Sequence, residues 1–598
     1  MTTPTLNPTA QARADELLSL MTVEEKAGLL FHAMASVGPG GKVLGADDEP
    51  GIGGPTRQLI EAGISHFALM GPASPEDIAR WHNEAQDIAK QNRLSVPITV
   101  SSDPRHGFFS NPATGAAASG FSQWPEHLGL GAVRDVNLVR EHADIVRREL
   151  TAVGIRVALG PTLDIASDPR WARTLGTFGA DPEIVSTLSR AYIEGLRGTS
   201  PAEEVAAMIK HFPGGGAQKD GEDPHFPYGR EQVWPGDRFK DHLQPFIDAL
   251  DLGVTQIMPY YGMPVGLHLN GKPVEEVGFA FNGQIINELL RDQLGFDGIV
   301  CTDFTLVTDG HVFGAPMLAR AWGLEHLNRA ERVLAILNAG CDQLGGEASQ
   351  ELVVKLVTDG RLSEARLDES ARRLLTEKFR LGLFDNAEVD VDAVASGVGT
   401  PKNTAKGLAA QRSSIVVTDD AESFLPLTEG ISVYAEGIDP ATLSRYAQVA
   451  ASPSEADTAL LRIEAPYEER TEGMERFFRA GSLDFTKSQL ERLTTIQSQV
   501  PTIVDVFLDR PALLGQLSSR VQAVTVNFGA SDEALLDILF GRVERRGALP
   551  FEISQSMEQV ASRREDVSFE DETPRYSYGH GIPSPHRPPY EATQEQHS

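Results

Sequence analysis

Between about residues 60 and 345, short apolar runs alternate with helical segments, and this alternation constrains the fold more than any other feature of the chain. Each run is rich in β-branched residues and ends in polar ones; the runs cover 66–71, 96–103, 155–164, 205–212, 254–261, 299–304 and 336–344. Helical stretches such as 136–154 and 286–295 separate them. Strands that alternate with helices predict βαβ units and a parallel sheet. Seven or eight such units in about 300 residues are what a (β/α)8-type barrel requires, so we expect an α/β fold.

The chain of 598 residues is too long for one ordinary domain, and the pattern indicates where it divides. We expect a barrel domain over 1–385, and a linker without helical period over 386–410. Apolar runs at 413–418, 431–436, 459–466, 502–508 and 523–529 then predict a smaller α/β sandwich domain over 411–582. The polar, proline-rich residues 583–598 are expected to form a disordered tail.

Charge and cysteine content exclude several classes of protein. The chain has 53 Lys and Arg residues against 84 Asp and Glu residues, a formal net charge of −31, which argues against nucleic-acid partners and anionic membrane surfaces. Cys301 and Cys341 are too few for a disulfide scaffold and have no metal-ligand spacing. Because the N-terminus shows no secretory signal and no apolar run reaches the length of a membrane span, a cytoplasmic protein is expected.

Polar residues close most of the barrel runs. In a barrel of this kind the active site lies at the carboxyl ends of the strands, so these residues are candidates for chemistry, although each one alone could be a helix cap. The residues are Asp103, Asp164, Lys210 and His211, Tyr260 and Tyr261, Asp303, and Asp342.

Two of these positions carry more specific patterns. Asp303 follows an apolar strand directly, where a carboxylate could attack the anomeric carbon of a sugar or cap a helix. The stretch from Lys210 to Gly216 contains three glycines but no Gly-Lys-Ser/Thr, so it is not a phosphate loop. The His and acidic residues that follow it, up to 225, lack the spacing of a metal site, and we expect no metal.

Together these stretches resemble glycoside hydrolase family 3, which includes β-glucosidases and exo-glucanases. The matching stretches are ADELLSLMTVEEKAGLL (14–30), Asp103-Pro-Arg-His106-Gly, Asp168-Pro-Arg-Trp-Ala-Arg173, Lys210-His211-Phe, Thr302-Asp303-Phe304, LLDILFGRVERRGALPFEI (535–553) and YSYGHGI (576–582). The resemblance covers nearly the whole chain. It implies a barrel followed by an α/β sandwich, and a retaining mechanism without a cofactor.

Carried over residue by residue, the resemblance assigns most of the site. It makes Asp303 the nucleophile. It places four residues around the hydroxyls of the nonreducing-end sugar: Asp103, Arg173, Lys210 and His211. Met258 and Tyr261 match positions of an apolar wall beside that sugar, or are ordinary barrel packing.

The identity of the acid/base group stays open, because each of the two domains offers a candidate. Many family members use a Glu on a second-domain loop, and the corresponding stretch here, Glu464-Ala-Pro-Tyr467-Glu468-Glu469, favours Glu469, or Glu468 after a one-residue shift. The alternative is an Asp-x-His dyad as in bacterial N-acetylglucosaminidases of the family, which would be Asp223 and His225 here. The loop before this dyad is two residues longer than expected for that subgroup, and Pro replaces its Ser.

The aromatic residues predict an altered leaving-group site. Phe304 stands where Trp is usual, and all five tryptophans lie in the barrel, so a clamp with one Trp from each domain cannot form. We expect Phe477 or Phe478 to provide stacking instead.

The sequence therefore predicts an exo-acting retaining β-glycosidase, a β-glucosidase in the first instance, with a small carbohydrate as its substrate. A β-N-acetylglucosaminidase and a catalytically inactive sugar-binding protein on the same scaffold are the alternatives, and a homo-oligomer is left open.

Overall fold

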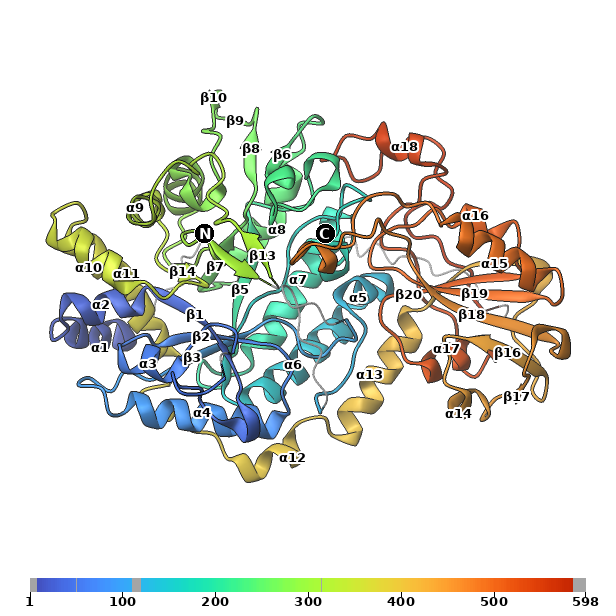
Figure 1. Cartoon of the computed structure of the whole chain (residues 1–598), viewed down its shortest axis with the longest axis horizontal. Helices are drawn as coiled ribbons and strands as arrows, with labels where there is room; N and C mark the ends of the chain where they lie inside the picture. The colour runs from blue at the N-terminus through green and yellow to red at the C-terminus, as the bar shows by residue number, and fades with distance from the viewer. Residues whose placement is uncertain (1–7, 50, 110–119, 313, 585–598) are drawn as a thin grey trace, which may run out of the picture.

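The computed structural model describes residues 8–49, 51–109, 120–312 and 314–584. The chain forms two domains that lie side by side (Figure 1), a barrel from blue to yellow and a second domain in orange and red. Across the described residues, no helix combines the length and the apolar character that a membrane crossing requires.

The first domain is built on eight parallel strands in the order β11-β7-β5-β4-β3-β2-β1-β14. A parallel bridge between Cys301 and Gln343 joins the two outer strands, which closes the sheet into a barrel. The strands are β1 (Phe31–Ser36), β2 (His66–Met70), β3 (Thr99–Ser102), β4 (Ile155–Ala158), β5 (Ala206–Phe212), β7 (Gln256–Pro259), β11 (Ile299–Val300) and β14 (Leu344–Gly345). This confirms the predicted (β/α)8-type barrel.

Helices surround the strands and begin at sequence signals that are easy to read. The side chains of Asp135 and Asp181 cap α6 and α7, and Asn328 and Glu331 form a capping box at α9. The helices are α1 (Pro8–Leu18), α2 (Val23–Leu29), α3 (Thr56–Glu61), α4 (Pro75–Ala89), α5 (His127–Val133), α6 (Val136–Ala152), α7 (Pro182–Arg197), α8 (Phe239–Leu250), a π-helix (Gln284–Gln293), α9 (Arg329–Ala339), α10 (Gln350–Thr358) and α11 (Glu364–Arg380).

One predicted strand is mostly wrong. Residues 336–339 are the last turn of α9, and Gly340, at a φ of 107°, ends that helix. Only Leu344 and Gly345 are in strand β14. The apolar residues at the end of α9 are buried like those of a strand, so the run could not be distinguished from one by composition.

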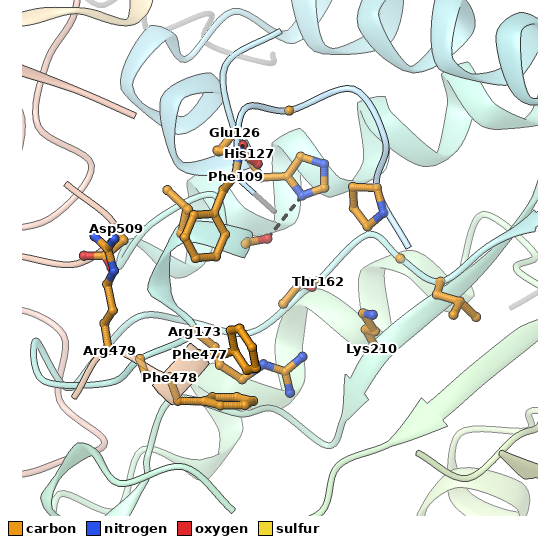
Figure 2. Close-up of a pocket in the computed structure, with 17 residues that line it drawn as sticks. Phe109, Glu126, His127, Thr162, Arg173, Lys210, Phe477, Phe478, Arg479 and Asp509 are labelled. Carbon is orange, nitrogen blue, oxygen red and sulfur yellow. Dashed lines mark hydrogen bonds and ion pairs between the residues drawn. The ribbon is translucent and has the colours of Figure 1, made fainter. Parts of the chain in front are cut away.

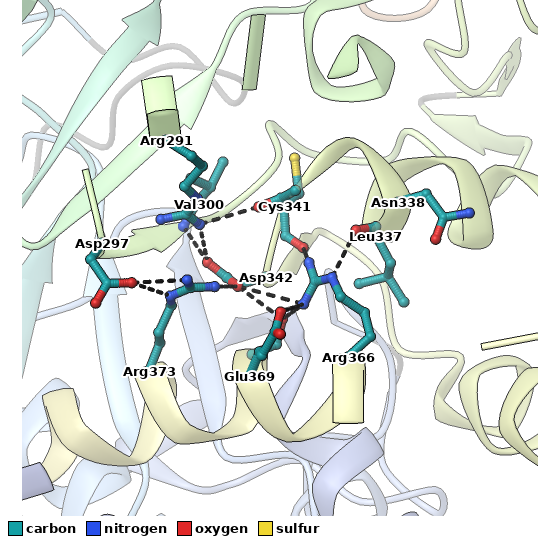
Figure 3. A network of polar contacts seen from close by, with 12 residues as sticks. Arg291, Asp297, Val300, Leu337, Asn338, Cys341, Asp342, Arg366, Glu369 and Arg373 are labelled. Carbon is teal, nitrogen blue, oxygen red and sulfur yellow. Dashed lines mark hydrogen bonds and ion pairs between the residues drawn. The ribbon is translucent and has the colours of Figure 1, made fainter. Parts of the chain in front are cut away.

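Asp342 therefore precedes its strand instead of closing it, and it lies away from the active end of the barrel. Its carboxylate accepts the N–H of Val300 at 3.0 Å and pairs with Arg291 at 2.6 Å and Arg373 at 2.9 Å (Figure 3). These guanidinium groups lower the pKa of Asp342 although its burial would raise it. The prediction that Asp342 joins the catalytic set is wrong, since its charge is used to hold α11 against β11.

The second domain contains a six-stranded sheet in the order β15-β20-β19-β18-β16-β17, in which only β15 is antiparallel to its neighbour. The strands are β15 (Val416–Asp420), β16 (Ser432–Glu436), β17 (Gln448–Val449), β18 (Thr458–Glu464), β19 (Thr502–Phe507) and β20 (Ala523–Asn527). Helices α14 (Pro440–Leu443), α15 (Lys487–Gln497), α16 (Gly515–Ser518), α17 (Asp532–Leu539) and α18 (Met557–Ala561) accompany them.

Both faces of this sheet are covered. Leu460 and Ile503 belong to one buried cluster, and the next residues along their strands, Leu461 and Val504, belong to another. Because successive side chains of a strand point to opposite faces, two clusters mean that helices cover both sides. The predicted smaller α/β domain is confirmed.

The segment between the domains is not the nonhelical linker that we expected. It contains α12 (Val394–Gly397) and α13 (Pro401–Ser414), and α13 contacts α5 and α6 of the barrel as well as α17 of the second domain. The start of α13 has a cap at Thr400 with Pro401 in the first turn, a signal that the missing periodicity concealed. The predicted disordered tail lies, from residue 585 on, outside the described residues.

Candidate active site

Charged side chains meet where the barrel strands end. Asp103 follows β3, and its carboxylate pairs with the ammonium group of Lys210, near the end of β5, at 2.8 Å. Asp164, six residues beyond β4, pairs with Nδ1 of His211 at 2.7 Å. The alternation of the sequence thus brings together residues that are far apart along the chain, as the barrel prediction requires.

The Asp164 carboxylate fixes both the position and the tautomer of His211. It also accepts the backbone N–H of His211 at 3.1 Å and of Gly215 at 2.6 Å. Burial raises the pKa of Asp164 to about 6 and lowers that of His211 well below its ordinary value. At neutral pH the imidazole is therefore neutral, with its proton on Nδ1 and its Nε2 atom able to accept a hydrogen bond.

Asp303 lies opposite that nitrogen. Its Oδ2 is 3.8 Å from Nε2 of His211. Its Oδ1 accepts the backbone N–H of Phe304 at 2.8 Å, whereas Oδ2 is buried and has no hydrogen-bond partner among the described residues. One carboxylate oxygen is thus held in place while the other is free to react.

Met258 and Tyr261 come from β7 and the turn after it, and both are buried. The Tyr261 hydroxyl donates to the carbonyl oxygen of Phe304 at 2.8 Å and accepts its N–H at 2.9 Å. Tyr261 therefore does more than pack in the barrel, because it fixes the backbone next to Asp303.

Arg173 adds a positive charge to the same region. Burial alone would lower its pKa, but Tyr260 and the carboxylates of Asp223 and Asp303 raise it above the ordinary value. Its Nη1 atom is buried and finds no partner in the described part of the chain.

Asp223 and His225 form a buried pair at this end of the barrel. Nδ1 of His225 lies 2.6 Å from Oδ1 of Asp223, and Oδ2 of Asp223 is buried without a partner among described residues. The His225 ring contacts Tyr261 with ring centres 4.5 Å apart, and Phe478 of the second domain at 4.7 Å. Burial lowers the pKa of His225 and the Asp223 carboxylate opposes this shift.

Glu468 and Glu469 are placed differently. Both are exposed, on the loop after β18. The Glu468 carboxylate turns back on its own domain and accepts the N–H of Ser482 at 3.2 Å. For Glu469 no hydrogen bond or ion pair occurs with any residue in the described ranges.

Four buried polar atoms without partners in the described part of the chain thus gather at one end of the barrel. They are Nη1 of Arg173, Nε2 of His211, Oδ2 of Asp223 and Oδ2 of Asp303. An unsatisfied buried polar group costs about 1–3 kcal/mol, so such a set indicates a ligand that supplies both donors and acceptors. Hydroxyl groups do both, and a polyol such as a sugar carries several of them.

Comparison with known proteins identifies the family. The model described as "Glycosyl hydrolase family 3 N terminal domain" matches residues 62–377, and "Glycosyl hydrolase family 3 C-terminal domain" matches 317–583. The chain is 46% identical over 578 residues to "Beta-glucosidase C" of Emericella nidulans, an alignment that covers 95% of this chain and 92% of that protein. The chain belongs to glycoside hydrolase family 3.

The chain is also similar to a further curated protein and to solved structures. The chain is 35% identical to "Periplasmic beta-glucosidase/beta-xylosidase" of Dickeya chrysanthemi, over 96% of this chain and 90% of that protein. The structure of a β-glucosidase from Listeria innocua in complex with isofagomine superposes with a TM-score of 0.74 at 21% identity, over 96% of this chain and 83% of that one. An exo-1,3/1,4-β-glucanase from a Pseudoalteromonas species gives 0.77 at 20% identity, over 97% and 75%. At these identities the two structures support the fold.

In this family 3 hydrolase a pocket runs between the two domains (Figure 2). Lys210 and Arg173 line it on the barrel side, and Phe477 and Phe478 of the second domain line it as well. The sequence predicted the two phenylalanines correctly as second-domain neighbours of the site, although their role in stacking stays a prediction. Within the described ranges no group of three or more His, Cys, Asp or Glu residues could hold a metal ion.

Three other residues near the site escaped the sequence analysis. Arg320 is buried and donates to the carbonyl oxygen of His225 at 3.4 Å and to the hydroxyl of Thr305. Arg479 and Asp509 line the interdomain pocket. None of the three stands in a motif or at the end of a barrel strand, so no signal in the sequence could have selected them.

Proposed function

We propose that this protein is an exo-acting β-glucosidase that removes the nonreducing-end glucose from short oligosaccharides or glycosides, with retention of the anomeric configuration. Two relatives that match almost the whole chain carry β-glucosidase in their names. The observation that carries the proposal is the free, buried Oδ2 of Asp303 beside three further polar atoms that have no partner among the described residues.

The reaction proceeds in two displacements. Oδ2 of Asp303 attacks the anomeric carbon, the bond to the leaving oxygen breaks, and that oxygen takes a proton from the acid/base group. The glycosyl–Asp303 ester is then attacked by water, which gives its proton to the same acid/base group and releases glucose. The N–H of Phe304 keeps Oδ1 out of the reaction, because that oxygen already accepts a hydrogen bond at 2.8 Å.

The sugar is held by charged groups around the nucleophile. Asp103 and Lys210 present an acceptor and a donor that are already paired at 2.8 Å, and vicinal hydroxyls can bridge such a pair. Arg173 donates from its unpartnered Nη1, and His211 accepts through Nε2, both free among the described residues. These four side chains together recognise a neutral, hydroxylated ring.

For the acid/base group we propose His225, oriented by Asp223. Its ring lies against Tyr261, whose hydroxyl holds the backbone beside Asp303. The sequence favours Glu468 or Glu469, but both are exposed and the Glu468 carboxylate bonds to Ser482. The Asp223 carboxylate orients the ring and opposes the lowering of the His225 pKa by burial, which favours the exchange of a proton in a fixed direction.

Variants separate these assignments. Asp303→Ala should lower turnover of nitrophenyl β-glucoside by several orders of magnitude, and near-normal activity would overturn the proposal. His225→Ala should lose about 10²–10⁴-fold on cellobiose and far less on a dinitrophenyl glucoside, whose leaving group needs no proton. Added azide should restore turnover and yield β-glucosyl azide. If Glu468→Ala or Glu469→Ala shows this behaviour and His225→Ala does not, the glutamate is the acid/base group.

A β-N-acetylglucosaminidase is the second candidate, favoured by the buried Asp223–His225 pair alone. A screen of nitrophenyl glycosides of glucose, xylose, galactose and N-acetylglucosamine decides between them. If kcat/KM is highest on the nitrophenyl glycoside of N-acetylglucosamine, the protein is a β-N-acetylglucosaminidase and the β-glucosidase assignment is wrong. The cytoplasmic location stays a prediction from the sequence, and the oligomeric state stays open.

A further inference from the structure

The interdomain pocket has a polar end that the mechanism above does not use. Figure 2 shows Arg479 and Asp509 together at one end of the pocket and Lys210 at the other, with Phe477 and Phe478 between them. Since Lys210 belongs to the sugar-binding set, a leaving group attached to that sugar would extend toward the polar end.

Two polar atoms at this end are buried and have no partner in the described part of the chain: Nη1 of Arg479 and Oδ1 of Asp509. The two side chains approach each other through other atoms, with Nε of Arg479 3.5 Å from Oδ2 of Asp509. Asp509 is only 4% exposed. Its unused oxygen is an acceptor and the unused nitrogen of Arg479 is a donor, so one hydroxylated ligand could satisfy both.

The rest of the pocket suits the face of a ring. Phe109 stacks on Phe507 with ring centres 6.4 Å apart, and the guanidinium of Arg479 lies 6.0 Å from the Phe109 ring. Phe477 and Phe478 provide further aromatic surface. Apolar faces of sugar rings pack on aromatic side chains, while their hydroxyls point sideways to polar groups.

The loop that carries Arg479 is fixed before any ligand arrives. The buried guanidinium of Arg510 donates to the carbonyl oxygens of Ala480 at 2.9 Å and Gly481 at 2.8 Å, and to that of Arg170 in the barrel at 3.2 Å. A pocket held in this way loses little conformational entropy on binding. The free donor of Arg479 and the free acceptor of Asp509 are therefore in place before a ligand binds.

We propose that this pocket binds the leaving group, and that Arg479 and Asp509 select leaving groups that carry ring hydroxyls, namely a second sugar residue, over plain aryl groups. The proposal rests on the β-glucosidase function proposed above and names its substrate class. The hydroxyls of a second sugar residue can satisfy both polar atoms, whereas an aryl group such as nitrophenyl has no donor for Oδ1 of Asp509 and leaves that atom unsatisfied at a cost in transition-state binding.

The test compares kcat/KM on cellobiose and laminaribiose with kcat/KM on nitrophenyl β-glucoside. Asp509→Asn and Arg479→Met should each lose roughly 10- to 100-fold on the disaccharides and less than about threefold on the aryl glucoside. Asp484→Asn and Arg492→Met, which change exposed residues of the same domain, should leave kcat/KM unchanged on the disaccharides and on the aryl glucoside. If Arg479→Met does not fold, Arg479→Lys keeps the charge and loses the planar donor.

A second measurement uses the pocket as an acceptor site. With nitrophenyl β-glucoside as donor and added glucose as acceptor, the wild-type enzyme should form disaccharide. The yield of disaccharide per turnover should be at least about fivefold lower in Asp509→Asn. Equal losses on aryl and disaccharide substrates would mean that the substitutions act on the first-sugar site or on the fold, and no loss on either would mean that the two atoms bind only water. Either result would overturn the proposal. A wild-type protein inactive on every β-glucoside would instead refute the proposed function.

Discussion

Replacing Asp164 by Asn tests whether the orientation of His211 matters to the reaction. The Asp164 carboxylate accepts three N–H groups: from the backbone of His211 at 3.1 Å, from that of Gly215 at 2.6 Å and from the His211 ring at 2.7 Å. An Asn has the same shape but only one accepting oxygen. At least one N–H must then face an NH₂ group, or the His211 ring must move its proton to Nε2.

The size of the effect follows from these contacts. An unsatisfied buried donor costs about 1–3 kcal/mol. If the proton moves to Nε2 instead, it points at Oδ2 of Asp303, 3.8 Å away, and the ring can no longer accept a sugar hydroxyl. A loss of about 1.4–3 kcal/mol in transition-state binding corresponds to about a 10- to 150-fold lower kcat/KM.

The assay is kcat/KM on nitrophenyl β-glucoside, with thermal unfolding of the same samples. Asp505→Asn is the matched control, because Asp505 is a buried carboxylate in β19 that accepts from Thr525 and Asn527, both at 2.8 Å. Both variants should lower the unfolding temperature, but only Asp164→Asn should lower kcat/KM. Activity of Asp164→Asn within twofold of the wild type, or an equal loss in Asp505→Asn, would show that the tautomer of His211 is unimportant.

Two further predictions concern a carboxyl group of the barrel, Glu126, and an ion pair between the domains, Arg470–Glu222. Burial raises the pKa of Glu126 from 4.5 to about 7, although its carboxylate accepts the N–H groups of Phe108 and Phe109. The stability that the protonated form of Glu126 contributes is therefore complete below about pH 4.5 and is lost as the pH rises to about 7. Between pH 5 and pH 8, urea denaturation should therefore show a loss of about 2.5 kcal/mol in the stability of the wild type that is absent in Glu126→Gln. Identical pH dependence in both proteins would refute the assignment. Arg470 holds the barrel loop of the proposed dyad by donating to the Glu222 carboxylate at 2.7 and 2.8 Å. Arg470→Met should therefore raise KM severalfold, with a loss of stability of about 1 kcal/mol or less. An unchanged KM would mean that this ion pair does not position the loop.

The residues at the strand ends could be predicted because the barrel fold itself gathers them. A polar residue at or just beyond the end of a buried parallel strand lies at the carboxyl end of the sheet, as Asp103 does after β3 and Lys210 does near the end of β5. Asp342 did not, since β14 begins only at Leu344 and the apolar residues before Gly340 belong to α9. Apolar composition marks burial, but it does not mark which end of a short strand a residue occupies.

The contribution of the second domain could be predicted only in part. Phe478 reaches His225 although the two are far apart along the chain, and the contact depends on how the two domains pack together. Hydrophobic periodicity describes one element at a time and contains nothing about such packing. For the same reason Arg479 and Asp509 have no visible signal, and the exposure of Glu468 and Glu469 could not be foreseen.

The first sugar and the leaving group contact different kinds of structure, namely the barrel strands and the segments of the second domain that line the interdomain pocket. Lys210 lies in β5 and is held in place by the barrel's hydrogen bonds, so the groups around the first sugar can change little without loss of the fold. The second-domain residues that line the interdomain pocket instead lie outside the strands of their sheet. Arg510 fixes the segment that carries Arg479 through backbone carbonyls, which do not depend on the side chains of that segment. Substitutions in this loop can therefore alter the choice of leaving group while Asp303 and the sugar-binding set stay unchanged. Specificity for the first sugar and specificity for the leaving group should accordingly vary independently in this scaffold.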